Sequence, residues 1–205
     1  MLKIISENAR SVKRLIAAQI FVAVFSFLII FATALLGTVN ILISVFCVCF
    51  YLFFIYTFMW EAGAKAAARK AVPDKKAAFK ISAAIMLTAN LFNILCAVTY
   101  AVCKFVYAAS GNTDRLFVEI GNFAWMFVKY TQAMYLGIET AIFRPQEGVY
   151  LLANPLYFFL IVIPPVAMGI AAYMLGWSEF SILRKMGFNV KHEYKSENTY
   201  KSNWK

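Results

Sequence analysis

The chain has 205 residues, of which 62% are hydrophobic and only 15% are charged, whereas a soluble domain usually carries about a quarter charged residues. The formal net charge is +10, but the Lys and Arg residues flank long apolar runs, so a positive-inside signal accounts for them better than nucleic-acid binding does. The composition therefore argues against a soluble domain and predicts an all-α integral membrane protein, with one polytopic helix bundle over residues 1–177.

The first two apolar runs predict an antiparallel pair of membrane helices. The first run, 15–36, follows a basic N-terminal stretch and is long enough to cross the hydrocarbon core. A cleaved signal peptide is the alternative, because the small residues 32–34 are typical of a cleavage site, but the run is longer than the apolar region of such signals. The second run, 41–60, follows a turn at 37–40 and ends at Trp60, which suits the headgroup level.

A basic stretch and a third span follow. Residues 61–80 are rich in Lys, Arg and Ala, and the preceding helix should continue into them until Pro73. The third span is predicted over 81–108. Asn90 and Asn93 lie near its middle on one helix face, which makes them candidate intramembrane polar contacts. They could contact a substrate or an ion, but a hydrogen bond that fixes helix packing is the preferred interpretation.

The segment 116–143 is apolar enough to cross the membrane but carries several polar residues. In a helical projection these residues fall on one side, and large apolar residues fall on the other, so the segment is predicted to be an amphipathic helix. We expect it to lie along the outer interface or to dip in as a re-entrant element. The alternative is a fifth span. The candidate outer polar face consists of Glu119, Lys129, Gln132 and Glu139.

The last span is predicted over 155–177, with Pro164 and Pro165 in its middle. Two prolines remove two backbone donors and should bend or break the helix there. Such a break could mark a discontinuous helix at a binding site, as in transporters, or a static kink. A basic tail follows at 178–205.

The distribution of charge predicts the topology. Most of the 20 Lys and Arg residues lie in the N-terminal stretch, in 61–80 and in the tail, whereas 110–149 has an acidic excess. About four spans place all three basic regions in the cytoplasm, and five spans would translocate the tail against the positive-inside bias. We therefore expect a multi-pass protein of the cell membrane, a bacterial inner membrane, with both termini cytoplasmic.

The sequence offers no catalytic set. Motifs such as HExxH, GxSxG and a glycine-rich phosphate loop are missing, so we expect no enzymatic activity and no cofactor. A metal site is not predicted either, because the only histidine lies in the tail and the cysteines lie within apolar runs, where they act as small hydrophobic residues. These residues are His192, Cys47, Cys49, Cys96 and Cys103.

Two short motifs resemble small, uncharacterised polytopic membrane proteins of Gram-positive bacteria. One is Trp60-Glu61-Ala62-Gly63-Ala64-Lys65, and the other is Tyr173-Met174-Leu175-Gly176-Trp177 followed by Phe180-Ser181. The resemblance covers about a tenth of the chain. It implies a location and a topology, and no activity.

These observations favour a non-enzymatic accessory or partner-binding membrane subunit. Its expected partners are the lipid bilayer and either another membrane protein or a second copy of the chain, with no nucleic acid. The alternative is a small-solute transporter or substrate-binding membrane subunit, built around the asparagine pair and the prolines of the last span.

Overall fold

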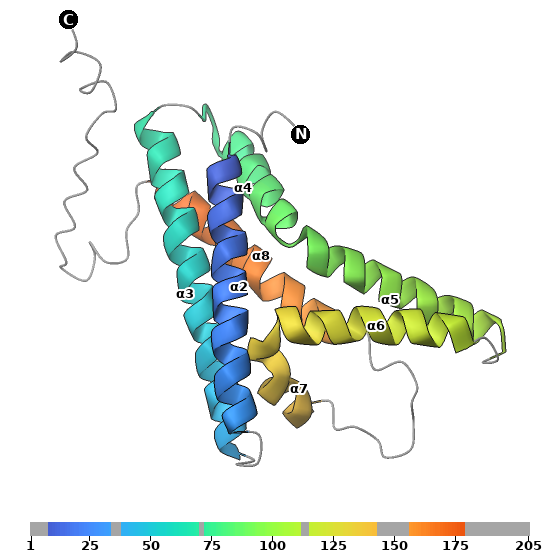
Figure 1. The fold of residues 1–205 in the computed structure, drawn as a ribbon. Helices are drawn as coiled ribbons and strands as arrows, with labels where there is room; N and C mark the ends of the chain where they lie inside the picture. The colour runs from blue at the N-terminus through green and yellow to red at the C-terminus, as the bar shows by residue number, and fades with distance from the viewer. Residues whose placement is uncertain (1–7, 34–37, 70–71, 112–114, 143–155, 179–205) are drawn as a thin grey trace, which may run out of the picture.

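The computed structural model describes residues 8–33, 38–69, 72–111, 115–142 and 156–178, which contain helices and no strand. The predicted all-α class is therefore confirmed. Three helices are long and apolar enough to cross a membrane, and the last helix contributes a shorter apolar stretch, so the chain is a polytopic helical membrane bundle (Figure 1). The elements are α2 (Ala9–Ala32), α3 (Thr38–Ala68), α4 (Lys75–Ala89), α5 (Leu91–Ala109), α6 (Arg115–Thr131), the 3-10 helix η2 (Ala133–Tyr135), α7 (Leu136–Ile142) and α8 (Leu156–Trp177).

The antiparallel pair predicted for the first two spans is present as α2 and α3, which lie side by side in Figure 1. Phenylalanine rings of the two helices meet between them, with centroids 6.4 Å apart for Phe21 and Phe54 and 6.2 Å apart for Phe25 and Phe50. As expected, α3 continues beyond Trp60 and ends before Pro73. The beginning of α2 and the end of α3, which carry basic side chains, thus lie at the same end of the pair (Figure 1).

α8 packs against α3 over the largest interface in the described structure, and glycines allow the two backbones to approach closely. A Cβ atom on Gly176 would lie 2.9 Å from the carbonyl carbon of Trp60, and one on Gly63 would lie 2.9 Å from the backbone nitrogen of Trp177. Small residues at such positions are the usual means of close helix packing in a membrane. This contact fixes the end of α8 beside the end of α3.

The prolines of the last span do not break it. α8 runs without interruption from Leu156 to Trp177, with Pro164 and Pro165 inside it. The helix is therefore not broken at these prolines, and the bend that was the other predicted outcome stays a prediction. Proline has a φ angle that a helix accepts, and α8 packs against α3 and α4, so its packing outweighs the two missing backbone donors.

The third predicted span is divided at Asn90 into α4 and α5, so a single helix over 81–108 is wrong. Asn90 has φ −97° and ψ 9°, and its side-chain amide donates a hydrogen bond of 3.0 Å to the carbonyl oxygen of Met86. This side chain competes for backbone groups that a continuous helix would use. Beyond the interruption, α5 leaves the bundle and forms a hairpin with α6 (Figure 1).

The segment 116–143 also differs from the single amphipathic helix that was predicted. It comprises α6, η2 and α7, and the chain changes direction at Gln132. α6 packs against α5 and crosses the direction of α2 and α3 (Figure 1), whereas α7 packs against α3. The close contact of α7 uses Gly137, where a Cβ atom would lie 2.6 Å from the carbonyl oxygen of Asn40.

Candidate functional site

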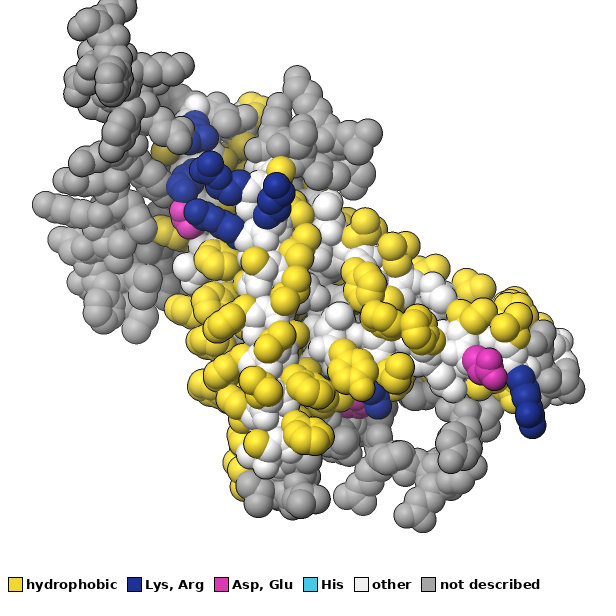
Figure 2. Space-filling model, viewed as in Figure 1, with side chains coloured by type: hydrophobic (Ala, Val, Ile, Leu, Met, Phe, Trp, Pro, Cys, Tyr) yellow, Lys and Arg dark blue, Asp and Glu magenta, His cyan; other side chains and the backbone are white. Residues whose placement is uncertain are grey.

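Basic side chains gather at one end of the bundle. Figure 2 shows them where α2 begins and α3 ends, away from the apolar sides of these helices. The beginning of α4 lies at the same end (Figure 1). Three segments that are separate in sequence therefore contribute to one positively charged surface. Its described residues are Arg10, Lys13, Arg14, Lys65, Arg69, Lys75, Lys76 and Lys80.

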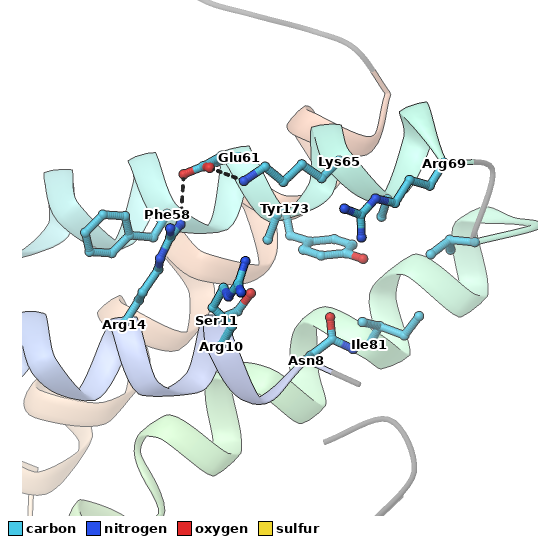
Figure 3. Close-up of a pocket in the computed structure, with 13 residues that line it drawn as sticks. Asn8, Arg10, Ser11, Arg14, Phe58, Glu61, Lys65, Arg69, Ile81 and Tyr173 are labelled. Carbon is cyan, nitrogen blue, oxygen red and sulfur yellow. Dashed lines mark hydrogen bonds and ion pairs between the residues drawn. The ribbon is translucent and has the colours of Figure 1, made fainter. Parts of the chain in front are cut away.

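A cavity of about 570 Å³ opens at this end between α2, α3, α4 and α8. Figure 3 shows arginines of α2 and side chains of α3 around the same space, with Tyr173 of α8 beside them. The polar ends of α2 and α3 both line this cavity, whereas the middle parts of the two helices pack through apolar side chains. The residues that line the cavity include Arg10, Arg14, Glu61, Lys65, Arg69 and Tyr173.

Positive charge exceeds negative charge in the lining of this cavity. Glu61 is the acidic member, and it binds both Arg14, at 3.3 Å between Nη1 and Oε2, and Lys65, one helical turn along α3. Arg10 forms no ion pair with the described part of the chain. One carboxylate therefore faces four cationic side chains, and the surplus favours an anion.

Two further features of the cavity suit a negatively charged ligand. The first turn of α2 contains no acidic residue, and the side chain of Asn8 does not cap it, so the positive end of the helix dipole borders the cavity. Tyr173 is 1% exposed and brings a hydroxyl group to the wall. The site can therefore bind an anion through guanidinium, ammonium and hydroxyl donors.

A second polar group of residues is buried where η2 and α7 pack against α2 and α3. Gln132 and Tyr135 are 1% exposed and Glu139 is 6% exposed. The Nζ of Lys129 lies 3.0 Å from Oε1 of Glu139 and 5.1 Å from the ring centroid of Trp125. Burial raises the pKa of the Glu139 carboxyl group, and the ion pair with Lys129 opposes this shift.

Ser44 of α3 connects α3 to η2 and α7 through hydrogen bonds. Its hydroxyl donates a hydrogen bond of 2.5 Å to the carbonyl oxygen of Met134 and accepts one of 3.3 Å from the backbone N–H of Ile138. Other polar atoms here lack a hydrogen-bond partner in the described structure, namely both amide atoms of Gln132, the hydroxyl of Tyr135 and Oε2 of Glu139. A buried water is the usual partner of such atoms.

The predicted outer polar face is therefore wrong as a single face turned to water. Glu119 is exposed on α6, but Gln132 and Glu139 are buried. The prediction assumed one continuous helix, and the turn at Gln132 changes the helical phase. The structure instead brings Lys129 and Glu139 together across that turn.

The asparagine pair has a local role in the structure. Asn90 and Asn93 are both buried, and the side-chain amide of Asn93 donates a hydrogen bond of 3.4 Å to Oδ1 of Asn90. Together with the hydrogen bond from Asn90 to Met86, this contact joins the end of α4 to the beginning of α5. The two side chains are therefore close to each other, although Asn90 lies at the helix interruption and Asn93 lies in α5.

Sequence reasoning missed the cavity as a site. Its Lys and Arg residues served only as topology markers, because positive charge beside an apolar run needs no further explanation. One signal was present: Glu61, Lys65 and Arg69 follow one another at intervals of one helical turn, beyond the end of an apolar run. Tyr173 gave no signal, since its position opposite α3 depends on tertiary packing.

The fold and the charged end define the class of this molecule, a polytopic α-helical membrane protein. Comparison of the chain with known protein families, with curated proteins and with solved structures finds no match. The described residues contain no group of three or more His, Cys, Asp or Glu side chains that could hold a metal ion.

Proposed function

We propose that this protein is a non-enzymatic, partner-binding subunit of the cell membrane whose basic end faces the cytoplasm and binds an acidic protein. The observation that supports the proposal is the gathering of cationic side chains at the end of the bundle where α2 begins, α3 ends and α4 begins (Figures 1 and 2). Such a surface attracts acidic partners over a distance and orients them on approach.

The exposed beginning of α4 is the part of this end that best suits a protein partner. Lys75, Lys76 and Lys80 are exposed there, beside Phe79, which is 52% exposed. Charged side chains around an exposed aromatic ring are typical of an interface with a small apolar centre and a polar rim. The α4 face, defined as these four residues, is therefore the proposed docking surface.

Neutralising the α4 face should release the partner. We expect a stoichiometric acidic protein to co-purify with the wild-type chain in mild detergent, and its yield to fall at least about tenfold in K75Q/K76Q/K80Q, since three charge contacts are lost. Glutamine is chosen because reversed charges could change the topology. Arg115→Gln, at the far end of α6, is the matched control. The proposal fails if no stoichiometric partner appears or if the triple variant retains it.

The proposed topology places both termini in the cytoplasm. Reporter fusions after Lys205 and at Gly111 should report opposite sides of the membrane, cytoplasmic for the first and external for the second. The physical reason is the positive-inside bias of the basic end. An external location of the C-terminal reporter would contradict the topology and remove the α4 face from the cytoplasm.

The alternative function, a small-solute transporter, has less support. It depended on Asn90 and Asn93 as solute contacts and on a helix break at Pro164 and Pro165. The asparagines are engaged with each other and with the backbone of α4, and α8 continues through its prolines. Helix packing accounts for these features, so the basic end supports a partner-binding subunit better than they support a transporter.

A further inference from the structure

We infer that the cavity between α2, α3, α4 and α8 is a binding site for a phosphate group. This site is distinct from the α4 face, because its donors come from α2, α3 and α8 and the lysines of the α4 face do not line it. The inference goes beyond the proposed function and does not require that a protein partner exists.

The donors of the cavity match the chemistry of phosphate. Arg10, Arg14 and Arg69 all line it, and a guanidinium group forms two parallel hydrogen bonds to phosphate oxygens, which an ammonium group cannot do. Arg10 and Arg14 belong to α2 and Arg69 directly follows the end of α3, so the arginines approach the cavity from two sides (Figure 3). The beginning of α2 adds its helix dipole, which favours phosphate at this position.

Glu61 affects how strongly the cavity can bind an anion. It holds Arg14 and Lys65 in place through ion pairs, but its carboxylate also repels an anion that enters the cavity. A phosphate group would therefore compete with Glu61 for two of the four cationic side chains. Removing this carboxylate should strengthen phosphate binding, whereas removing the guanidinium group of Arg10 should weaken it.

The size and position of the cavity define two sources of phosphate. A volume of about 570 Å³ exceeds that needed by one phosphate group, so a glycerol or sugar unit can accompany it. Phe58 lines the cavity towards the apolar part of α3, and Trp60 and Trp177 lie at the same level of the bundle, as is typical of the headgroup region. The phosphate can thus belong to an anionic phospholipid or to a soluble phosphorylated molecule.

The test measures both sources with the full chain. Native mass spectrometry of the detergent-purified protein compares phosphatidylglycerol with phosphatidylcholine, and titration calorimetry without added lipid uses inorganic pyrophosphate. We expect at least one anionic probe to bind with at least about tenfold preference over its control, phosphatidylcholine or sodium chloride. Arg10→Gln should weaken binding about tenfold, the effect of losing a hydrogen bond to a charged group, and Glu61→Gln should strengthen it severalfold.

Lys75→Gln is the matched control, because it removes a positive charge from the same end without altering the cavity. It should change affinity less than about twofold, in keeping with a screened surface charge. Preference for phosphatidylglycerol alone assigns a lipid headgroup, and binding of pyrophosphate assigns a soluble ligand. Absence of preference for either probe, or equal effects of Arg10→Gln and Lys75→Gln, overturns the inference. The gain expected for Glu61→Gln cannot result from misfolding.

Discussion

Gly176→Ala is expected to destabilise the protein by about 1–3 kcal/mol, the usual cost of adding a methyl group to a packed interior. The new Cβ atom would lie 2.9 Å from the backbone carbon of Trp60 and 3.0 Å from the backbone nitrogen of Ala64. Backbone atoms cannot move aside as a flexible side chain can, so α3 and α8 must separate. Thermal unfolding in detergent, followed by tryptophan fluorescence, measures the effect.

Ala171→Val provides the matched control for this prediction. Ala171 lies on the exposed side of α8, so two added methyl groups meet no backbone there. The thermal unfolding midpoint of Ala171→Val should stay close to that of the wild type. An equal loss of stability in both variants would mean that α8 tolerates no enlargement, and the tight contact with α3 would then not be the cause.

Lys129→Met is expected to destabilise the protein by about 2–3 kcal/mol at pH 8, because it leaves the carboxylate of Glu139 buried without its cation. This loss is below the about 3–5 kcal/mol that is usual for breaking a fully buried ion pair, because the Lys129 side chain is 37% exposed and solvent screens its charge. The loss should depend on pH. Burial raises the pKa of Glu139, so the folded state favours its neutral form. The contribution of Glu139 to stability is then most favourable at low pH and becomes less favourable as the pH rises through the pKa of the folded state.

Thermal unfolding midpoints between pH 5 and pH 8 test this dependence. The unfolding midpoint of Lys129→Met should approach that of the wild type as the pH is lowered to 5. In the double variant Lys129→Met with Glu139→Gln, the midpoint should differ much less between pH 5 and pH 8. The double variant controls for packing, because it removes both charges and nearly preserves both side-chain volumes. A pH-independent loss in Lys129→Met would show that its apolar contacts, and not the charge, account for the effect.

Periodicity and charge predicted the parts of the fold that depend on local sequence. The runs 15–36 and 41–60 gave the antiparallel pair, and Pro73 correctly limited the extension of α3, because apolar length and proline geometry act within one helix. The same local logic failed at Asn90 and Gln132. Both interruptions occur within apolar sequence: Asn90 makes a local hydrogen bond to the carbonyl oxygen of Met86, and Gln132 lies where the chain turns so that α7 can pack against α3.

The candidate site was less predictable than the fold. The sequence predicted a cytoplasmic position for Arg10, Arg14 and Lys65 but could not show that they surround one cavity. That arrangement depends on how α8 packs, and α8 reaches α3 only because two glycines oppose backbone. The buried pair of Lys129 and Glu139 was missed for a similar reason, since the turn between α6 and α7 alters the helical phase on which the prediction relied.

The interruption at Asn90 separates two parts of the molecule that have different neighbours. α4 belongs to the bundle through its contacts with α8 and α2, whereas α5 makes most of its contacts with α6. The joint between the parts is a small aromatic cluster, in which Phe158 of α8 lies 5.1 Å from the ring of Tyr100 and 5.6 Å from that of Trp125. The two helices of the α5 and α6 hairpin therefore contact each other more extensively than they contact the rest of the bundle. Changes at the tip of this hairpin should add independently to changes at the basic end, because the two share few neighbours.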